Sequence, residues 1–378
     1  MDAVDSIRRW GEDRDWRGYD PYDALNSPFA TYLTLDTAFG RRALTQVVKR
    51  SPLNLRPLLR IQPAYNDKAL GLVASGYARL AVARADDTAA DAAHRWLDRV
   101  VSDAVVDGTG RAWGYHFDVR TRFFGYAKGT PNTIATSFVA HALLDGLELL
   151  GEARFGDAAR EAAGFLVDHM LDSDEDRSFF RYVPDERELV HNANLLACSV
   201  VARTSALRDE PLDERVAAAV ATSVEAQRAD GSWAYSAGPV GDWVDNFHTG
   251  YVLESLGRCA ALVDDLQPVL ERGFSYWERE LFVPTGEPKP TPRRRFPVDA
   301  HDYAQTIETW LSALNWHDEA FERAERTADL LVKRMLNAHG YVDFQCGRFL
   351  TNRVPFVRWT TAPAFRALAG LELARSRR

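Results

Sequence analysis

The sequence predicts an all-α protein, an (α/α)6 toroid in which six outer helices surround six inner helices. Three observations support this prediction. One unit, made of an aromatic turn, a polar helix start and an alanine- and leucine-rich helix, recurs six times at intervals of 54 to 66 residues. Two kinds of helix alternate along the chain, and the segments between them are short. A repeat of this length indicates one supersecondary unit that is used several times.

The first kind of helix is apolar around most of its circumference, which is typical of helices at the centre of a fold. Each one follows a polar residue of the type that starts helices. The predicted starts are Asn66, Asn132, Asn192, Asn246, Asp302 and Thr360, and the apolar runs after them span 69–80, 134–150, 195–206, 249–261, 304–314 and 364–374. We expect these runs to form the inner ring.

The second kind of helix is amphipathic, with apolar residues at spacings of three and four and charged residues on the opposite face. It is predicted over 35–49, 88–106, 155–171, 212–229, 263–281 and 319–337. Helices of this kind cover a buried set, so we expect them to form the outer ring. An open solenoid is the alternative, but helical solenoids usually repeat at ~33–47 residues. The longer period favours a closed ring.

The repeat continues through the whole chain, which predicts a single toroid domain over residues 1–378. Residues 1–33, rich in aromatic and acidic side chains, are expected to fold onto the barrel. The proline-rich segment 283–298 lies inside the fifth repeat and suits an extended loop at one end of the barrel.

Composition excludes several classes of protein. The net charge is −8 and the only basic cluster is Arg293–Arg295, so no nucleic-acid partner is expected. The three cysteines lie far apart, and neither zinc spacing nor a glycine-rich phosphate loop is present, so no metal and no cofactor are expected. The sequence lacks a run of ~20 apolar residues, which predicts a cytoplasmic protein that does not span a membrane.

The candidate site is the end of the ring at which the inner helices begin, here called the mouth. His191, His248 and His301 recur at matching places in three successive repeats, and Asp245 and Asp302 stand beside two of them. Histidine and carboxylate in one cavity provide a general base and its partner near neutral pH. We predict that His248 and His301 are the acid–base groups, that Asp245 and Asp302 orient them, and that Tyr115 and Tyr182 are reserve proton donors.

Aromatic rings beside polar groups at this mouth suit a sugar, which has an apolar C–H face and a rim of hydroxyls. The structural alternative is that the rings brace loops and that the asparagines, threonines and aspartates only cap helices. The predicted substrate-binding residues are Trp113, Asn132, Arg181, His191, Asn192, Trp233, Trp243, Asn246, Asp299, Arg358 and Trp359.

Three segments, 22–28 (YDALNSP), 245–251 (DNFHTGY) and 297–305 (PVDAHDYAQ), make the chain similar to a group of α/α-toroid proteins. These proteins, of the prenyltransferase- and squalene-cyclase-like or six-hairpin type, are encoded in microbial loci for surface polysaccharides and glycoprotein glycans. The resemblance implies polysaccharide biosynthesis or protein glycosylation. It also implies a glycan, a nucleotide sugar or a lipid-linked sugar as the partner.

Related six-hairpin sugar enzymes and uronate epimerases imply acid–base chemistry by carboxylate, histidine or tyrosine in such a cavity. Epimerisation, β-elimination and hydrolysis are all compatible with these residue types. Two other functions stay open: a scaffold protein that binds a glycan without changing it, and an enzyme that handles isoprenoids. The second would require an apolar cavity below the mouth, and the Asp-x-Asp-Asp motif of terpenoid cyclases is absent from the sequence.

Overall fold

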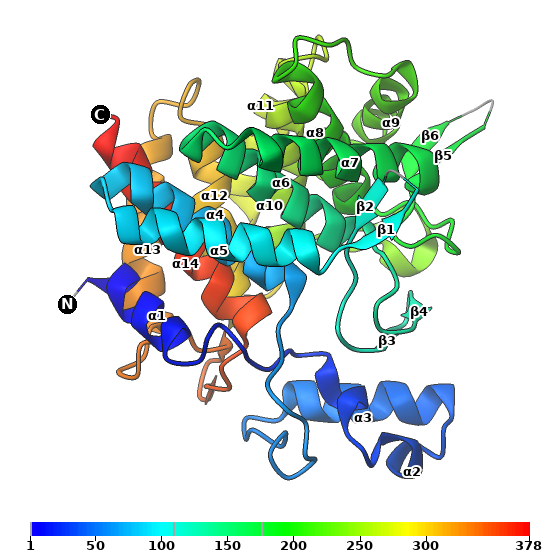
Figure 1. Ribbon diagram of the computed structural model, residues 1–378, viewed down its shortest axis with the longest axis vertical. Coiled ribbons are helices and arrows are strands. Elements are labelled where there is room, and N and C mark those ends of the chain that lie inside the picture. Colours follow the sequence, from blue (N-terminus) through cyan, green and yellow to red (C-terminus); the bar gives the residue numbers. More distant parts are fainter. Residues whose placement is uncertain (1, 109, 175–176) are drawn as a thin grey trace.

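Six helices form a closed inner ring in the computed structural model, which describes residues 2–108, 110–174 and 177–378 (Figure 1). Each inner helix packs on the next, and the last packs on the first. The six are α4 (Asp67–Arg84), α6 (Thr133–Leu150), α8 (His191–Ala206), α10 (Asn246–Cys259), α12 (Ala300–Ser312) and α14 (Ala362–Ser376). The prediction of an all-α (α/α)6 toroid is confirmed.

Five of the predicted outer helices surround this ring: α5 (Asp87–Ser102), α7 (Ala153–Phe165), α9 (Glu214–Glu225), α11 (Gln267–Glu280) and α13 (Ala320–Met335). The position predicted for the sixth outer helix was wrong. The run 35–49 does form a helix, α3 (Ala38–Arg50), but this helix lies outside the ring. The outer position belongs to α1 (Ala3–Glu12), which packs against α14. Its Ile7 and Trp10 are buried in the main core, an apolar face that an amphipathic outer helix requires.

Three of the six inner helices, α8, α10 and α12, have their N-caps one to three residues before the predicted starts. Asn66 and Asn132 are N-caps as predicted, because their side chains accept hydrogen bonds from the first turn. The caps of α10 and α12 are instead Asp245 and Asp299, and α8 begins at His191. A π-helical turn, η4 (Val357–Thr361), leads into α14. The residues predicted as caps in these repeats therefore lie within the first helical turns.

Short strands and turns connect the helices. The strands are β1 (Val105–Asp107), β2 (Gly110–Ala112), β3 (Val119–Arg120), β4 (Gly125–Tyr126), β5 (Leu171–Ser173), β6 (Ser178–Phe180), β7 (Val298–Asp299), β8 (Gln345–Cys346) and β9 (Thr351–Asn352). The first six form three antiparallel hairpins, and the last three form one small sheet. Three short helical turns complete the connections: η1 (Asp23–Asn26), η2 (Leu166–Met170) and η3 (Pro239–Gly241). Segment 283–298 is an extended connection from α11 to α12, and its Pro290 carbonyl accepts from the backbone of Asn246 at 3.3 Å.

An insertion between α1 and α4 forms a separate feature, here called the N-terminal lobe and defined as residues 24–66. It contains α3 and the short helix α2 (Ala30–Thr34), which project from one end of the barrel in Figure 1. The inner helices begin at this same end, so the lobe lies beside the mouth. Lys49 of α3 connects the two, because its Nζ lies 5.3 Å from the ring centre of Trp359.

One helix of the described residues, α6, is long and apolar enough to cross a membrane by length and composition. Of its most apolar window, 78% is buried inside the protein. Its apolar character is explained by its place in the inner ring.

Candidate active site at the mouth of the barrel

The β3–β4 hairpin, residues 119–126, lies over the mouth. Phe124 stacks on Tyr182 with ring centres 4.2 Å apart, and Phe123 packs on Tyr235 at 5.3 Å. Arg122 of the same hairpin lies 5.9 Å from the ring centre of Trp243. These contacts place the hairpin over Tyr182, Tyr235 and Trp243 at the mouth.

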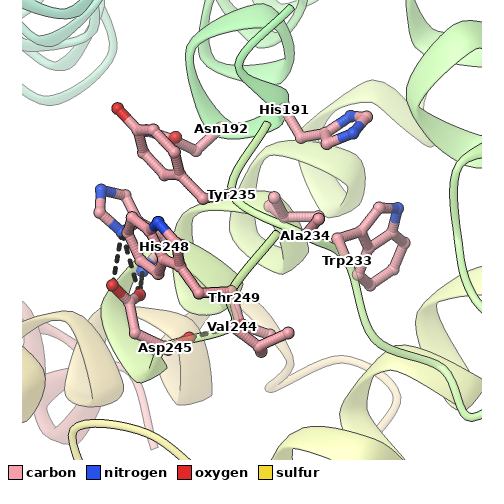
Figure 2. Close-up of a pocket in the computed structure, with 11 residues that line it drawn as sticks. His191, Asn192, Trp233, Ala234, Tyr235, Val244, Asp245, His248 and Thr249 are labelled. Atoms are coloured by element: carbon pink, nitrogen blue, oxygen red, sulfur yellow. Dashed lines mark hydrogen bonds and ion pairs between the residues drawn. The ribbon is translucent and has the colours of Figure 1, made fainter. Parts of the chain in front are cut away.

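His248 lies at the centre of one pocket and has a carboxylate partner. Its Nδ1 lies 2.8 Å and 3.0 Å from the two oxygens of Asp245 (Figure 2). A carboxylate accepts, so Nδ1 carries the proton and Nε2 has a free lone pair. Tyr235 and Trp243, stacked 4.5 Å apart, meet the imidazole with their planes steeply inclined to it. This geometry brings together the predicted base His248, its predicted partner Asp245 and the predicted sugar-stacking ring of Trp243.

His301 lies beyond Phe247, whose ring contacts both imidazoles at 4.0 Å and 5.0 Å between centres. The His301 ring stacks on Trp359, and its Nδ1 lies 2.9 Å from the Trp359 carbonyl oxygen. A carbonyl only accepts, so Nδ1 is the protonated nitrogen and Nε2 accepts from the hydroxyl of Tyr251 at 2.5 Å. Burial holds the pKa of His301 well below its usual value, so the ring is neutral. The structure therefore makes His301 a partner of Tyr251, a residue that sequence reasoning missed.

Asp302 does not orient His301, contrary to the sequence-based prediction. Its Oδ2 accepts from the backbone of Asp299 at 3.0 Å, and its Oδ1 has no partner among the described residues. Asp299 in turn accepts from the backbone of His301 and from the indole of Trp359. Burial raises the pKa of Asp299 to about 6 and that of Asp302 well above its usual range, where the neighbouring Asp299 charge adds to the effect. These two acids form a helix-capping pair with a high affinity for protons.

Arg358 holds the lobe side of the mouth in place. It forms a buried ion pair with Asp20, with Nη2 2.8 Å from Oδ1, and its guanidinium lies 4.7 Å from the ring centre of Tyr115. Its charge is thus balanced within the protein rather than free for a ligand. Burial raises the pKa of Tyr115 and of Tyr182 well above 10, so these predicted reserve donors keep their protons at neutral pH.

Lys68 is a second residue that the sequence did not reveal. It is 3% exposed, and its amine lies 3.8 Å above the ring of Phe138 and 5.6 Å from that of Tyr251. Burial holds the pKa of this amine well below 10.5, and the charge of Arg358 lowers it further. Lys68 lies in the first turn of α4. The first turns of the other inner helices contain the predicted site residues, so this position could have identified Lys68 as a further candidate.

Several predicted binding residues have structural roles instead. The indoles of Trp113 and Trp233 are buried and donate to the carbonyls of Val100 and Ser223. Asn132 caps α6, and Asn246 bonds Leu281 and Trp277. Arg181 holds the carbonyls of Pro184 and His169.

His191 is also structural by its contacts. Its Nδ1 lies 3.1 Å from the hydroxyl of Ser223, and in Figure 2 its ring points away from His248, as does Trp233. Burial lowers the pKa of His191 to about 4. Asn192 lines the His248 pocket together with His191, but unlike the His191 ring its Oδ1 has no partner among the described residues.

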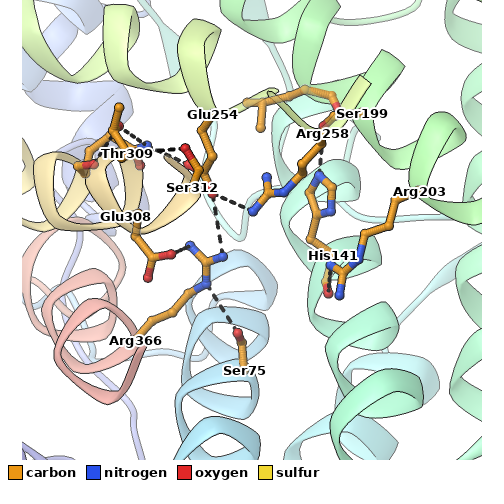
Figure 3. A network of polar contacts seen from close by, with 12 residues as sticks. Ser75, His141, Ser199, Arg203, Glu254, Arg258, Glu308, Thr309, Ser312 and Arg366 are labelled. Carbon is orange, nitrogen blue, oxygen red and sulfur yellow. Dashed lines mark hydrogen bonds and ion pairs between the residues drawn. The ribbon is translucent and has the colours of Figure 1, made fainter. Parts of the chain in front are cut away.

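Deeper in the barrel, a charged network joins all six inner helices (Figure 3). At its centre, Arg366 of α14 lies 3.2 Å from Glu308 of α12 and donates to Ser75 of α4. Glu254 of α10 accepts from Gln305 at 2.6 Å. The remaining members lie on α4, α6, α8 and α10: Arg79, His141, Asp145, Ser199, Arg203 and Arg258. An isoprenoid site would need an apolar interior here, so the network counts against that function.

The free space in the His248 pocket is about 10 Å³, room for one water molecule. A sugar ring is much larger. Phe123 and Arg122 of the β3–β4 hairpin pack on Tyr235 and Trp243, two residues that line this space.

Several solved sugar enzymes have a fold similar to that of this chain. No family model and no curated protein matches the chain. A cellobiose 2-epimerase from Bacillus thermoamylovorans superposes with a TM-score of 0.62 at 10% identity, over 98% of this chain and 99% of that chain. A family 76 mannosidase from Bacteroides thetaiotaomicron gives 0.62 at 9% identity, over 99% and 98%. A sugar epimerase from a ruminal bacterium gives 0.57 at 12% identity, over 82% and 87%. At these identities the likeness establishes the toroid fold.

Proposed function

We propose that this protein is a carbohydrate-active enzyme that epimerises a sugar by proton transfer at the mouth, in the building or modification of a cell-surface glycan. The observation that carries the proposal is the pair of imidazole systems on either side of Phe247. His248 has Asp245 as its partner, and His301 has Tyr251. Similarity to solved sugar epimerases supports the same chemistry at the level of the fold.

In this proposal His248 is the general base. Its Nε2 lone pair takes the proton from a carbon next to a sugar carbonyl, and the Asp245 carboxylate stabilises the imidazolium that forms. Asp245 also accepts from the backbone of His248 at 3.0 Å, which fixes both residues at the start of α10.

Tyr251 is the proposed acid on the other side of Phe247. Burial raises its pKa well above 10, so its hydroxyl keeps the proton until His248 has deprotonated the substrate. The hydroxyl then turns from His301 and gives this proton to the same carbon on the face opposite His248, which inverts the centre. The phenolate and the His248 imidazolium return to their starting states by proton exchange with solvent. The neutral His301 accepts from this hydroxyl and holds its position. In the same proposal Trp243 and Trp359 provide apolar faces for the sugar, and Asn192 provides a free amide oxygen.

Hydrolysis fits the geometry less well. Glycosidases use two carboxyl groups on opposite sides of the bond that is cleaved, commonly ~5–10 Å apart. Asp299 and Asp302 form a capping box at the start of α12, in which each carboxylate accepts from the backbone N–H of the other residue. Asp299 also accepts from the side chains of Trp359 and Gln345. Both carboxylates are thus held at the start of α12 by hydrogen bonds within the protein.

Hydrogen exchange in D2O tests the proposal. The protein is incubated with reducing disaccharides, including cellobiose, mannobiose and a uronic-acid disaccharide, and the proton beside the carbonyl is followed by NMR. We expect the signal of that proton to disappear as the epimer forms, and His248→Ala to slow this at least ~100-fold. His94→Ala is the matched control, because His94 lies on the outer helix α5 and pairs with Glu152 at 3.3 Å.

Other outcomes would change the assignment. Saturable binding of a sugar without exchange or turnover would indicate a glycan-binding protein. Stabilisation by prenyl phosphates alone would indicate an isoprenoid substrate. An unsaturated product would replace epimerisation by β-elimination, and equal exchange by His248→Ala and the wild type would contradict the role of His248.

A further inference from the structure

The N-terminal lobe exposes far more apolar surface than the rest of the molecule. Of the sixteen large apolar side chains that are exposed in the described residues, eight come from residues 29–58. Tyr32 and Phe39 are each 83% exposed, and Leu35 is 81% exposed. Scattered apolar residues are normal on a protein surface, but a concentration of this kind marks a surface that contacts something apolar.

These side chains have no role in the core. On α3, Val48 and Thr45 face inward, whereas Phe39, Ala43 and Val47 follow one another at four-residue spacing on the outer face. Leu35 ends α2 with φ 49°, a left-handed conformation that glycine adopts more easily. Leu35 is therefore explained neither by its backbone conformation nor by packing in the core.

A second apolar projection lies next to the lobe. Phe349 and Leu350, at the turn between β8 and β9, are 90% and 63% exposed. This turn is joined to the lobe through the side chain of Asn352, which donates to the carbonyl of Ser51 at 3.0 Å. Leu53 and Leu58, both exposed, follow within a few residues of Ser51. The apolar groups therefore gather on loops and on one helix face at the end of the molecule.

The lobe also has the opposite charge from the whole protein. Residues 24–66 contain six basic residues and a single acid, Asp36, whereas the whole chain has a net charge of −8. Arg56 and Arg41 pair with Asp23 and Asp118. Within the described part of the chain, the exposed Arg42, Arg50 and Arg60 have no acidic partner.

We propose that the N-terminal lobe docks the protein on an anionic lipid bilayer. Aromatic and leucine side chains that flank arginines are the combination that inserts into the headgroup region of such a surface while the arginines remain at the phosphates. A lobe-to-lobe contact between two copies would bring two positive surfaces together, which disfavours that alternative. Because the lobe adjoins Trp359 through Lys49, docking places the mouth beside the bilayer.

Vesicle co-sedimentation of the full chain tests the proposal. Vesicles of phosphatidylcholine with 30% phosphatidylglycerol are compared with pure phosphatidylcholine, at low and high salt. We expect binding to the anionic vesicles, weakened by salt. Leu35→Ser with Phe39→Ser should lower the affinity by about tenfold or more, because both side chains leave the membrane interior.

Two further variants separate the contributions. Arg42→Gln with Arg50→Gln should reduce binding and its salt dependence without changing the melting temperature, because both side chains are exposed. Val105→Ser with Val106→Ser, exposed on β1 away from the lobe, is the matched control and should bind as the wild type does.

Three results would overturn the proposal. One is the absence of binding to anionic vesicles, and another is equal binding by the Leu35/Phe39 variant and the wild type. The third is a dimer, seen by light scattering, that this variant abolishes, which would assign the lobe to contact between copies.

Discussion

Two levels of the barrel interior contain the same residue types in opposite electrostatic states. In the deep network, burial alone would raise the pKa of Asp145 and Glu254, but neighbouring arginines hold both below their usual range. At the mouth, burial raises the pKa of Asp299 and Asp302, and no arginine reverses the shift. The difference lies in the partners, since all four carboxyl groups are buried.

This contrast separates a structural centre from a functional one. A buried charge that is paired and hydrogen-bonded holds elements together, and removal of one partner is costly. Buried groups whose proton affinities are shifted by burial and by like charges are typical of active sites. The network joins six helices through balanced pairs, whereas the mouth contains a neutral histidine, an amine with a lowered pKa and acids with raised pKa values.

The largest expected effect is on the network. The guanidinium of Arg366 lies near the carboxylates of both Glu308 and Glu254. Because Arg366→Ala removes this shared cation from a buried site, it should lower the free energy of unfolding by about 3–5 kcal/mol. Urea unfolding measures this. Arg154→Ala removes an exposed pair with Asp98 and should cost less than about 1 kcal/mol. Similar losses in the two variants would contradict the structural role of the network.

The next effect is on catalysis. Tyr251→Phe removes the hydroxyl that bonds His301, and we expect kcat to fall about 100-fold while stability changes by about 1 kcal/mol. Tyr303→Phe is the control, since it removes a buried tyrosine hydroxyl that donates to Glu287 at 2.9 Å outside the mouth. Equal kcat in the two variants would remove Tyr251 from the mechanism.

A smaller effect should appear in the pH dependence of stability. The folded-state pKa of Asp302 lies above its unfolded value, so the fold binds an extra proton in the intermediate range. The free energy of unfolding therefore falls as pH rises from about 4 through the raised pKa.

Asp302→Asn cannot ionise and keeps an oxygen for the backbone of Asp299. Its melting temperature should exceed that of the wild type by about 1–2 °C at pH 8 and equal it near pH 4. A wild type that is the more stable protein at pH 8 would contradict the raised pKa.

The smallest effect concerns the aromatic surface. Trp243→Ala should weaken sugar binding about tenfold, since a stacked aromatic face contributes ~1–1.5 kcal/mol. Trp113→Ala is no control because that indole is buried in the core. Trp316→Ala is the control, since it changes a partly buried ring that packs on Phe274 of α11. Calorimetry with a sugar found in the exchange assay measures both affinities.

The sequence predicted the ring because helical periodicity and N-cap residues are local properties. It also predicted the His248–Asp245 pair, since residues three apart share a helix face. The place of α3 and the partners of His301 were not predictable in this way. Tyr251 lies 50 residues from His301, and the Trp359 carbonyl lies 58 residues away, so both contacts depend on how neighbouring repeats pack. Capping and catalysis select the same residues, and so Asp302, Asn132 and Asn246 resembled site residues until their contacts were known.

Thermal unfolding of the wild type and His248→Ala with a panel of sugars tests whether the mouth is the functional site. A ligand that binds only the folded state raises the melting temperature. We expect a sugar to stabilise the wild type, His248→Ala to lose this stabilisation, and the two proteins to melt alike without ligand. Equal stabilisation of both proteins would contradict the assignment of the mouth as the functional site.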